Sequence, residues 1–249
     1  MITLFSNTYK IADHVVRINS LHNDVHQLCS DYLSSENPEF EISVSQYDIN
    51  SEREKNKLER IREKLAPFDF SDGQLETTAV YRKLCEKLID FDIILMHGSV
   101  VAVDGEAYLF TAKSGTGKST HTRLWTEYFG ERAFIVNDDK PLIMLRNGTA
   151  TVYGTAWDGK HHISRNTSVK LKSVCILERS ENNHISRNEM SEIYPILLQQ
   201  IYKPKDTLKM LRILELTDRL NECVSFFTLG CNMETDAVIT AYNGMKGER

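Results

Sequence analysis

One short run of residues constrains the fold of this chain more than any other feature. Residues 111–120 read TAKSGTGKST and directly follow the apolar stretch Ala107–Phe110. Glycines at positions 115 and 117 allow the backbone to curl with its N–H groups directed inward, around phosphate oxygens. We expect a helix over residues 118–129, whose positive N-terminal end would face the same phosphates. The sequence therefore predicts a strand, a phosphate-binding loop and a helix.

The loop residues define an expected nucleotide site. Lys118 places a positive charge on the β- and γ-phosphates of ATP, and the Ser119 hydroxyl is positioned to ligate Mg²⁺, so ATP and Mg²⁺ are the expected cofactors. The full pattern has glycine at its first position, where this chain has Ala112. The alternative is a glycine-rich turn that caps an ordinary helix. The residues expected to bind the nucleotide are Ser114, Gly115, Thr116, Gly117, Lys118, Ser119 and Thr120.

The composition excludes several classes of function. The 249 residues carry a net charge of −5 and contain no Lys/Arg run, so we expect neither nucleic acid nor an anionic membrane as a partner. No apolar run approaches the length of a membrane span, and the N-terminus lacks the layout of a secretion signal, which predicts a cytoplasmic protein. The five cysteines are dispersed, so they indicate buried thiols rather than disulfides or a zinc site.

The pattern of residues along the chain changes near residue 92. Residues 1–91 carry charged, helical patterns and contain no glycine before Gly73, which predicts a separate N-terminal α+β segment. Residues 92–249 are rich in β patterns, with hairpins expected to turn at Asp104-Gly105 and at Asn147-Gly148. We expect this second segment to be the catalytic domain. The predicted fold class is therefore α/β, a mixed-sheet P-loop domain preceded by an α+β segment.

The N-terminal segment is expected to contain three helices and one strand. Apolar residues recur at helical spacing from Leu21 to Tyr32, which predicts a helix that ends near residue 35. A β-like stretch follows over residues 40–47. Ser51 and Glu54 match the capping-box pattern for the start of a second helix, and a third helix is expected over residues 72–88.

Two adjacent carboxylates follow the buried strand expected over residues 133–136. Asp138 and Asp139 come at the carboxyl end of this strand, where a metal-holding acid of a phosphoryl-transfer site is found. Adjacent side chains of an extended strand point to opposite sides, so one aspartate can reach Mg²⁺ while the other faces the acceptor. The alternative is an ordinary strand-ending turn, in which Asn and Asp are common. The expected metal ligands are Ser119, Asp138 and Asp139.

A histidine and one loop complete the candidate site. His97 precedes the hairpin that leads into the phosphate loop, so it is expected to orient an aspartate carboxylate, although a purely structural histidine is the alternative. The expected catalytic residues are thus Asp138, Asp139, His97 and Lys118. A loop that mixes an aromatic ring, an acid and bases is expected to contact substrate, with a solvated loop anchored in the core by its tryptophan as the alternative. Its candidate residues are Trp157, Asp158, Lys160 and His161.

Four further basic residues are candidate phosphate clamps. For each of them alone, ordinary surface charge is the favoured interpretation, because exposed charges rarely mark a site by themselves. They are Arg165, Arg179, Lys203 and Lys205.

Together these motifs resemble a known family. His97-Gly98, the hairpin, residues 114–119 and the sequence Asn137-Asp138-Asp139 are similar to the HPr kinase/phosphorylase catalytic domain, which shares its fold with ATP-dependent phosphoenolpyruvate (PEP) carboxykinase. The resemblance implies that the loop lysine and serine bind phosphates and Mg²⁺, that one aspartate takes the proton of a serine hydroxyl, and that the histidine pairs with it. This chain lacks the Arg- and Gly-rich segment that the family carries downstream.

The sequence thus predicts a kinase that transfers the γ-phosphoryl group of ATP to a hydroxyl, on a protein or peptide serine or on a small molecule. Two alternatives stay open, a PEP carboxykinase-like enzyme acting on a small carboxylic acid and a nucleotide-binding regulatory protein without transfer activity. No motif identifies the acceptor, because substrate choice depends on pocket shape and loop contacts. HPr kinases form oligomers, so the resemblance also allows a homo-oligomer.

Overall fold

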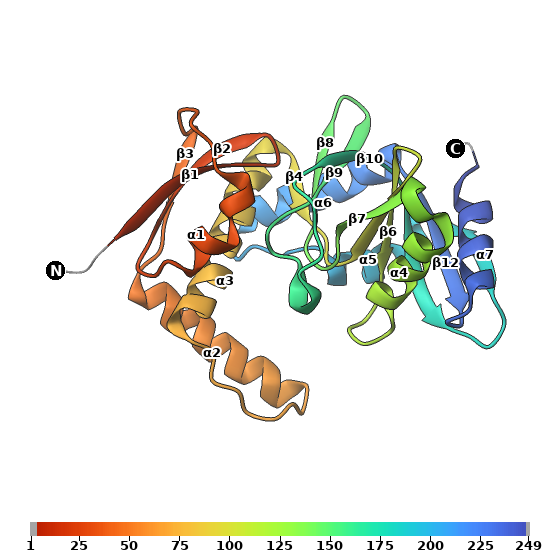
Figure 1. Ribbon diagram of the computed structural model, residues 1–249, viewed down its shortest axis with the longest axis horizontal. Helices are drawn as coiled ribbons and strands as arrows, with labels where there is room; N and C mark the ends of the chain where they lie inside the picture. The colour runs from red at the N-terminus through yellow and green to blue at the C-terminus, as the bar shows by residue number, and fades with distance from the viewer. Residues whose placement is uncertain (1–3, 248–249) are drawn as a thin grey trace. The chain divides into compact units, whose positions relative to one another are not determined.

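The computed structural model describes residues 4–247 (Figure 1). The chain divides into two compact units, residues 1–87 and residues 88–249. The first unit contains a three-stranded sheet in the order β1-β2-β3. Strands β1 (Phe5–Ile11) and β2 (His14–Ser20) form an antiparallel hairpin, and β3 (Phe40–Ser43) adds to β2 in parallel.

The helices of the first unit differ from the sequence expectation. The helix expected to end near residue 35 is only α1 (Asp24–Leu28), followed by the 3₁₀ turn η1 (Ser30–Tyr32). Helix α2 (Gln46–Arg62) begins before the expected cap at Ser51, because Ser45 and Asp48 offer the same spacing of cap and acid. The Asp48 carboxylate accepts a 2.9 Å hydrogen bond from the Ser45 N–H. Helix α3 (Asp72–Leu88) lies where the sequence predicts it.

The second unit is built on a mixed sheet, in which nine strands are found among the described residues. Strands β6, β10 and β12 run parallel to one another, and the other pairings are antiparallel. The strands are β4 (Ile93–Leu95), β5 (Ser99–Val103), β6 (Glu106–Thr111), β7 (Ala133–Asn137), β8 (Leu142–Arg146), β9 (Thr149–Tyr153), β10 (Ser168–Arg179), β11 (His184–Asn188) and β12 (Ser225–Cys231).

Helices cover both faces of this sheet. Side chains of α4 (Lys118–Phe129) and α7 (Thr235–Met245) pack in one hydrophobic cluster, and those of α5 (Met190–Gln200) and α6 (Thr207–Cys223) pack in another. Figure 1 shows α4 beside α7. Along β5 the side chains alternate between the two clusters, as the pleat of a strand requires. The central strands β5, β6 and β10 are therefore buried on both faces.

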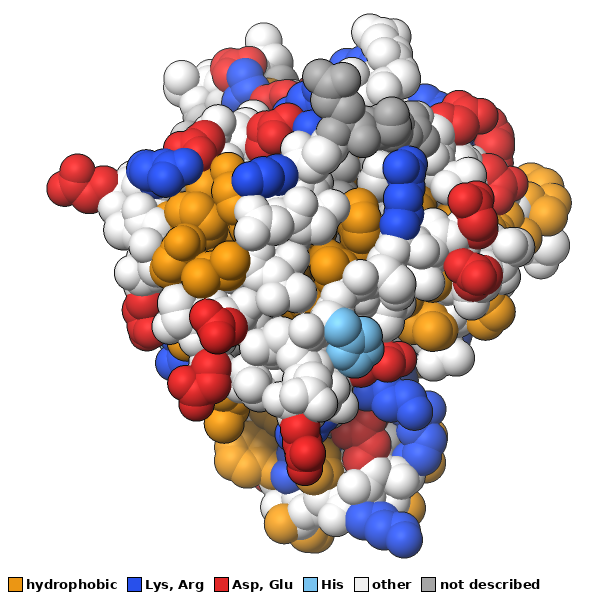
Figure 2. Space-filling model, turned by 90° about the vertical axis from the view of Figure 1, so that its right-hand side faces the viewer, with side chains coloured by type: hydrophobic (Ala, Val, Ile, Leu, Met, Phe, Trp, Pro, Cys, Tyr) orange, Lys and Arg blue, Asp and Glu red, His pale blue; other side chains and the backbone are white. Residues whose placement is uncertain are grey.

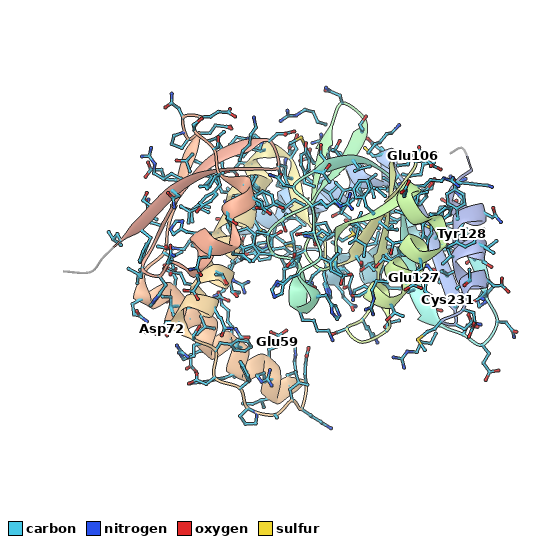
Figure 3. All side chains as sticks on the ribbon, in the orientation of Figure 1. Glu59, Asp72, Glu106, Glu127, Tyr128 and Cys231 are labelled. Carbon is cyan, nitrogen blue, oxygen red and sulfur yellow. The ribbon has the colours of Figure 1, made fainter. Side chains whose placement is uncertain are left out.

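One irregularity lies in the long central strand β10. Its pairing with β6 shifts register between Leu171 and Ser173, which marks a β-bulge at Lys172. The Lys172 ammonium lies 3.3 Å from the Glu106 carboxylate at the start of β6, which is labelled in Figure 3. The bulge is thus held at the end of β6 that is opposite to the phosphate loop.

The helices, the surface and the cysteines have three further features. No helix of the described part of the chain has both the length and the apolar character needed to cross a membrane. The face shown in Figure 2 carries acidic and basic side chains side by side, with hydrophobic side chains between them. All five cysteines are free thiols, three of them buried and two half-buried.

Candidate functional site

The loop between β6 and α4 depends on two glycines. Gly115 has φ +78° and Gly117 has φ +121°, a region of backbone conformation that residues with a Cβ rarely adopt. The space beside both is open, since an added Cβ would meet no atom within 4 Å. The conformation of the backbone, rather than crowding, therefore explains the glycines. Helix α4 begins at Lys118 and ends at Phe129, the bounds that the sequence predicts.

Lys118 is the buried cation of this loop. Its side chain is 8% exposed, and its ammonium donates a 3.1 Å hydrogen bond to the Ala112 carbonyl. Burial lowers the pKa of Lys118, while the charges of Asp139 and Asp138 act in the opposite direction. The buried Lys118 ammonium has lost its hydration, and one carbonyl acceptor does not replace it. An anionic ligand would therefore stabilise this charge.

Asp138 is held by hydroxyl groups. The Ser99 hydroxyl donates to the Asp138 carboxylate at 2.6 Å, and the same hydroxyl lies 2.7 Å from that of Thr122 on α4. Asp138 is 5% exposed, and it forms no ion pair with any residue of the described chain. This carboxylate is therefore oriented by neutral partners, and the charge of Lys118 acts on it without a direct ion pair.

Asp139 has the opposite environment. Its carboxylate lies 3.2 Å from His97 Nε2 and 3.4 Å from Lys140 Nζ. Burial alone would raise the pKa of Asp139, but the His97 hydrogen bond and the Lys140 charge outweigh it and lower the pKa. His97 Nδ1 lies 3.2 Å from Gln200 Oε1, so α5 fixes the other side of the imidazole ring. The two adjacent aspartates thus have separate partners, although both lie in the bend after β7 rather than in the extended strand that the sequence analysis assumed.

Asn137 shapes the turn that presents both aspartates. Its side-chain oxygen accepts the N–H groups of Asp139 at 2.9 Å and of Lys140 at 2.7 Å. Its amide group donates to the Thr155 carbonyl at 3.0 Å. This fully buried residue, together with Ser99 and Thr122, belongs to the site although sequence reasoning assigned it no role.

The loop after β9 packs directly against Asp139. Its 3₁₀ turn η4 (Gly159–His161) begins at a glycine with φ +75°, where an added Cβ would lie 3.0 Å from the Asp139 Cβ. Asp158 accepts a 2.8 Å hydrogen bond from the Ser164 hydroxyl and lies 3.3 Å from His162 Nδ1. The Trp157 side chain is 7% exposed, so this ring anchors the loop in the interior.

These elements enclose two neighbouring cavities. The first, which we call the carboxylate cavity, has a volume of about 550 Å³. It brings together most of the residues predicted from the sequence, and its lining consists of His97, Ser114, Gly115, Gly117, Lys118, Ser119, Thr120, Arg123, Asp138, Asp139, Asp158, Gly159, Lys160 and His161. Trp157 is not part of this lining.

The second cavity, which we call the apolar cavity, has a volume of about 690 Å³ and adjoins the same loop. It shares Gly115, Gly117 and Thr120 with the carboxylate cavity and also includes Thr116. Hydrophobic side chains from α4, from the ends of β10 and β12 and from the turn after β12 line it, namely Leu124, Leu177, Cys231 and Met233, with Cys231 labelled in Figure 3. All seven residues expected to bind the nucleotide therefore line one cavity or the other.

Among the four further basic candidates, Arg179 reaches the loop. Its guanidinium donates to the Gly115 carbonyl at 2.6 Å and to the Thr116 carbonyl at 3.4 Å. Arg165 lies over the Phe134 ring at 4.6 Å, and Lys203 donates to the Leu198 carbonyl at 2.8 Å. Neither of these two, nor Lys205, lines the two cavities.

The residues present fit Mg²⁺ bound together with a phosphate ligand. Within residues 4–247 no group of three or more His, Cys, Asp or Glu side chains forms a metal cage. Mg²⁺ is commonly held by one or two carboxylates, water and substrate phosphates rather than by a full protein cage. Ser119, Asp138 and Asp139 all line the carboxylate cavity, so the donor set has this composition.

Comparisons with known proteins give a distant likeness only. No family model and no curated protein matches the chain. Among solved structures, the HPr(Ser) kinase/phosphatase from Coxiella burnetii is similar to it with a TM-score of 0.36 and 12% sequence identity, over 61% of this chain and 99% of that chain. These values correspond to a distant relationship of fold and do not establish membership of a family.

Proposed function

We propose that this protein is a kinase that uses ATP and Mg²⁺ to phosphorylate a hydroxyl group. One observation carries the proposal. A buried lysine and a serine at the start of a helix line the same cavity as two aspartates with different partners. Phosphoryl transfer requires this combination, since catalysis depends on positioning the phosphates, holding the metal and accepting the proton of the acceptor.

The loop would hold the triphosphate. Lys118 and the loop N–H groups bind the β- and γ-phosphates, and the N-terminal end of α4 adds its positive dipole. Ser119 and Asp138 would hold Mg²⁺, which supplies positive charge that offsets the charge of the phosphates when it is bound. Asp138 suits this role because it is buried, oriented by Ser99 and unpaired with any cation of the described chain.

Asp139 would accept the proton of the acceptor. Its contact with His97 orients the carboxylate, and its lowered pKa keeps it ionised at neutral pH. As the acceptor oxygen forms a bond to the γ-phosphorus, the bond from this phosphorus to the bridging oxygen breaks and ADP leaves. The proton of the acceptor hydroxyl passes to the Asp139 carboxylate.

The apolar cavity would take the nucleoside. It adjoins the phosphate loop and is lined by Leu124, Leu177 and Met233, which suit the flat faces of a base. Met233 is 74% exposed, so a bound base would cover hydrophobic surface that is now open to water. The carboxylate cavity is then left for the γ-phosphate and the acceptor.

Separate measurements of binding and transfer test this proposal. The protein is incubated with ATP, Mg²⁺ and pooled hydroxyl metabolites and serine peptides, and mass spectrometry detects an acceptor that gains one phosphoryl group. Lys118→Ala is expected to lose both ATP binding and transfer. Asp139→Asn is expected to keep ATP binding and to lose transfer about 10²- to 10⁴-fold. Lys170→Gln, an exposed change outside both cavities, is the control.

Two results would contradict the proposal. Transfer that is intact in Asp139→Asn would remove this residue from its role as proton acceptor. ATP binding without any modified acceptor would instead favour a nucleotide-binding regulatory protein.

A further inference from the structure

The carboxylate cavity holds three basic side chains that the proposed mechanism does not use. They are Arg123 on α4 and Lys160 and His161 on η4. Within the described chain none of the three forms an ion pair. Arg123 Nε donates only to the Ser119 carbonyl at 3.2 Å, which leaves most of its guanidinium donors without a protein acceptor.

The carboxylates of the same cavity are not available to these bases. Asp139 is paired with His97 and Lys140, and Asp158 is bound by Ser164 and His162. Asp138 accepts from Ser99, and its charge acts on the nearby Lys118 ammonium. Arg123 and Lys160 therefore add positive charge to the lining of the cavity, and His161 adds an imidazole that can donate a hydrogen bond.

The three side chains lie in the cavity that the proposed function assigns to the acceptor. All three line the carboxylate cavity, and none lines the apolar cavity. Lys160 and His161 directly follow Gly159, which packs against Asp139. The triphosphate already has Lys118, the loop N–H groups, the N-terminus of α4 and Mg²⁺ as positive partners, so these bases are free for a second anion.

We infer that the acceptor carries an anionic group, a carboxylate or a phosphate, next to the hydroxyl that receives the phosphoryl group. Arg123, Lys160 and His161 bind this anion and so place the hydroxyl beside Asp139. The identity of the reacting hydroxyl rests on the proposed kinase function, whereas binding of the anion does not. Arginine and lysine side chains recognise both carboxylate and phosphate oxygens, so the inference defines the charge of the acceptor rather than its scaffold.

Matched acid and neutral probes test the inference by binding alone. The first pair is D-glycerate and glycerol, and the second is the peptide acetyl-Gly-Asp-Ser-Asp-Gly-amide and its Asn-for-Asp counterpart. D-Glycerate 3-phosphate and glycerol 3-phosphate extend the first pair to phosphate anions. Saturation-transfer NMR measures binding to the full-length protein, with and without Mg²⁺ and a non-hydrolysable ATP analogue.

The acidic or phosphorylated member of one pair is expected to bind at least about tenfold more tightly than its neutral partner, which is the effect of one well-placed charge-assisted hydrogen bond. The pair that shows this preference separates a small-molecule acceptor from a peptide. The preference should fall in Lys160→Gln and in Arg123→Gln and persist in Lys170→Gln. A Lys160→Arg variant, which keeps the charge, should retain it.

Equal binding of anionic and neutral members in every pair would overturn the inference, as would a preference that both glutamine variants retain. Failure of the proposed function has a different signature. If the protein does not bind the ATP analogue, or binds it without transfer, the kinase proposal fails while the preference for anions is still measured in the protein alone.

Discussion

The Ser99 hydroxyl donates a 2.6 Å hydrogen bond to the carboxylate of Asp138, and thereby links the first residue of β5 to the turn that follows β7. The same hydroxyl touches Thr122, so the helix after the phosphate loop and the carboxylate share one buried contact. A change in the position of α4 would therefore alter the hydrogen bonding of the Asp138 carboxylate.

Removing this hydroxyl should affect transfer more than nucleotide binding. In Ser99→Ala the Asp138 carboxylate loses its fixed orientation, and we expect a 10- to 100-fold loss, roughly, in transfer or in metal affinity. Titration of the protein with Mn²⁺, followed by electron paramagnetic resonance, measures the metal affinity separately from transfer. Ser99→Thr keeps the hydroxyl and should recover part of the loss. Unchanged Mn²⁺ affinity and transfer in Ser99→Ala would show that the contact is structural only.

The pKa of Asp139 should depend on His97. Burial raises this pKa, and the contacts with His97 and Lys140 lower it below its ordinary value. A lowered pKa in the folded state contributes stability above the pKa of the unfolded chain, and this stability is lost as the pH falls through the folded value. In His97→Ala the pKa of Asp139 should rise, so the acid limb of the pH–transfer profile should move to higher pH. An unchanged pH–transfer profile would show that His97 does not control the pKa of Asp139.

His121 should make the fold sensitive to acid. Burial lowers the pKa of His121 to about 4, and its Nε2 accepts a 3.0 Å hydrogen bond from the Trp125 indole N–H. The unfolded chain takes up this proton near pH 6.5 and the folded chain does not, so stability is lost as the pH falls from about 6.5 to 4, by about 3 kcal/mol. Urea unfolding across this range, followed by tryptophan fluorescence, measures the loss.

The His121→Gln variant is the control for this prediction, because glutamine keeps an acceptor for Trp125 and does not titrate. The free energy of unfolding of the variant should fall less steeply with acid than that of the wild-type protein. Parallel pH dependences in the two proteins would mean that His121 is solvated or already protonated.

Gly159 and Gly148 offer a matched pair of substitutions. Both have positive φ, +75° and +69°, so alanine at either position should cost roughly 1 kcal/mol of stability through backbone strain. An added Cβ meets Asp139 at Gly159 and open space at Gly148. Thermal unfolding should therefore show a loss of stability in both variants that is larger for Gly159→Ala, while only Gly159→Ala should lose transfer. Equal transfer in both variants would mean that η4 does not position Asp139.

Much of the second unit could be predicted because its turns carry local signals. The hairpins turn where Asp104-Gly105 and Asn147-Gly148 have positive φ, as Asp-Gly and Asn-Gly pairs favour. The hairpin of β1 and β2 turns at Ala12 and Asp13, also at positive φ, but Ala-Asp is not a turn signal. The sequence analysis therefore did not predict the hairpin of β1 and β2, because no recognisable turn sequence separates the two strands.

The candidate site was predictable where chemistry requires a residue type at a fixed spacing. Lys118, Asp138 and Asp139 follow from the loop and from the end of a strand, and the structure brings them to one cavity with His97. Ser99 and Thr122 could not be found in this way. A single hydroxyl in a strand or a helix has no pattern, and its role here arises only because tertiary packing brings β5 against α4.

The bulge at Lys172 sets the phase of side-chain alternation along β10. Leu171 and Val174 belong to the cluster under α5 and α6, although three positions separate them and a regular strand would turn them to opposite faces. Cys175 then joins the other cluster. Deleting Lys172 would therefore restore a regular strand. The side chains on one side of the deletion would then point to the opposite face of the sheet from the one they occupy now. A single residue with no part in either core thus decides which side chains each core receives.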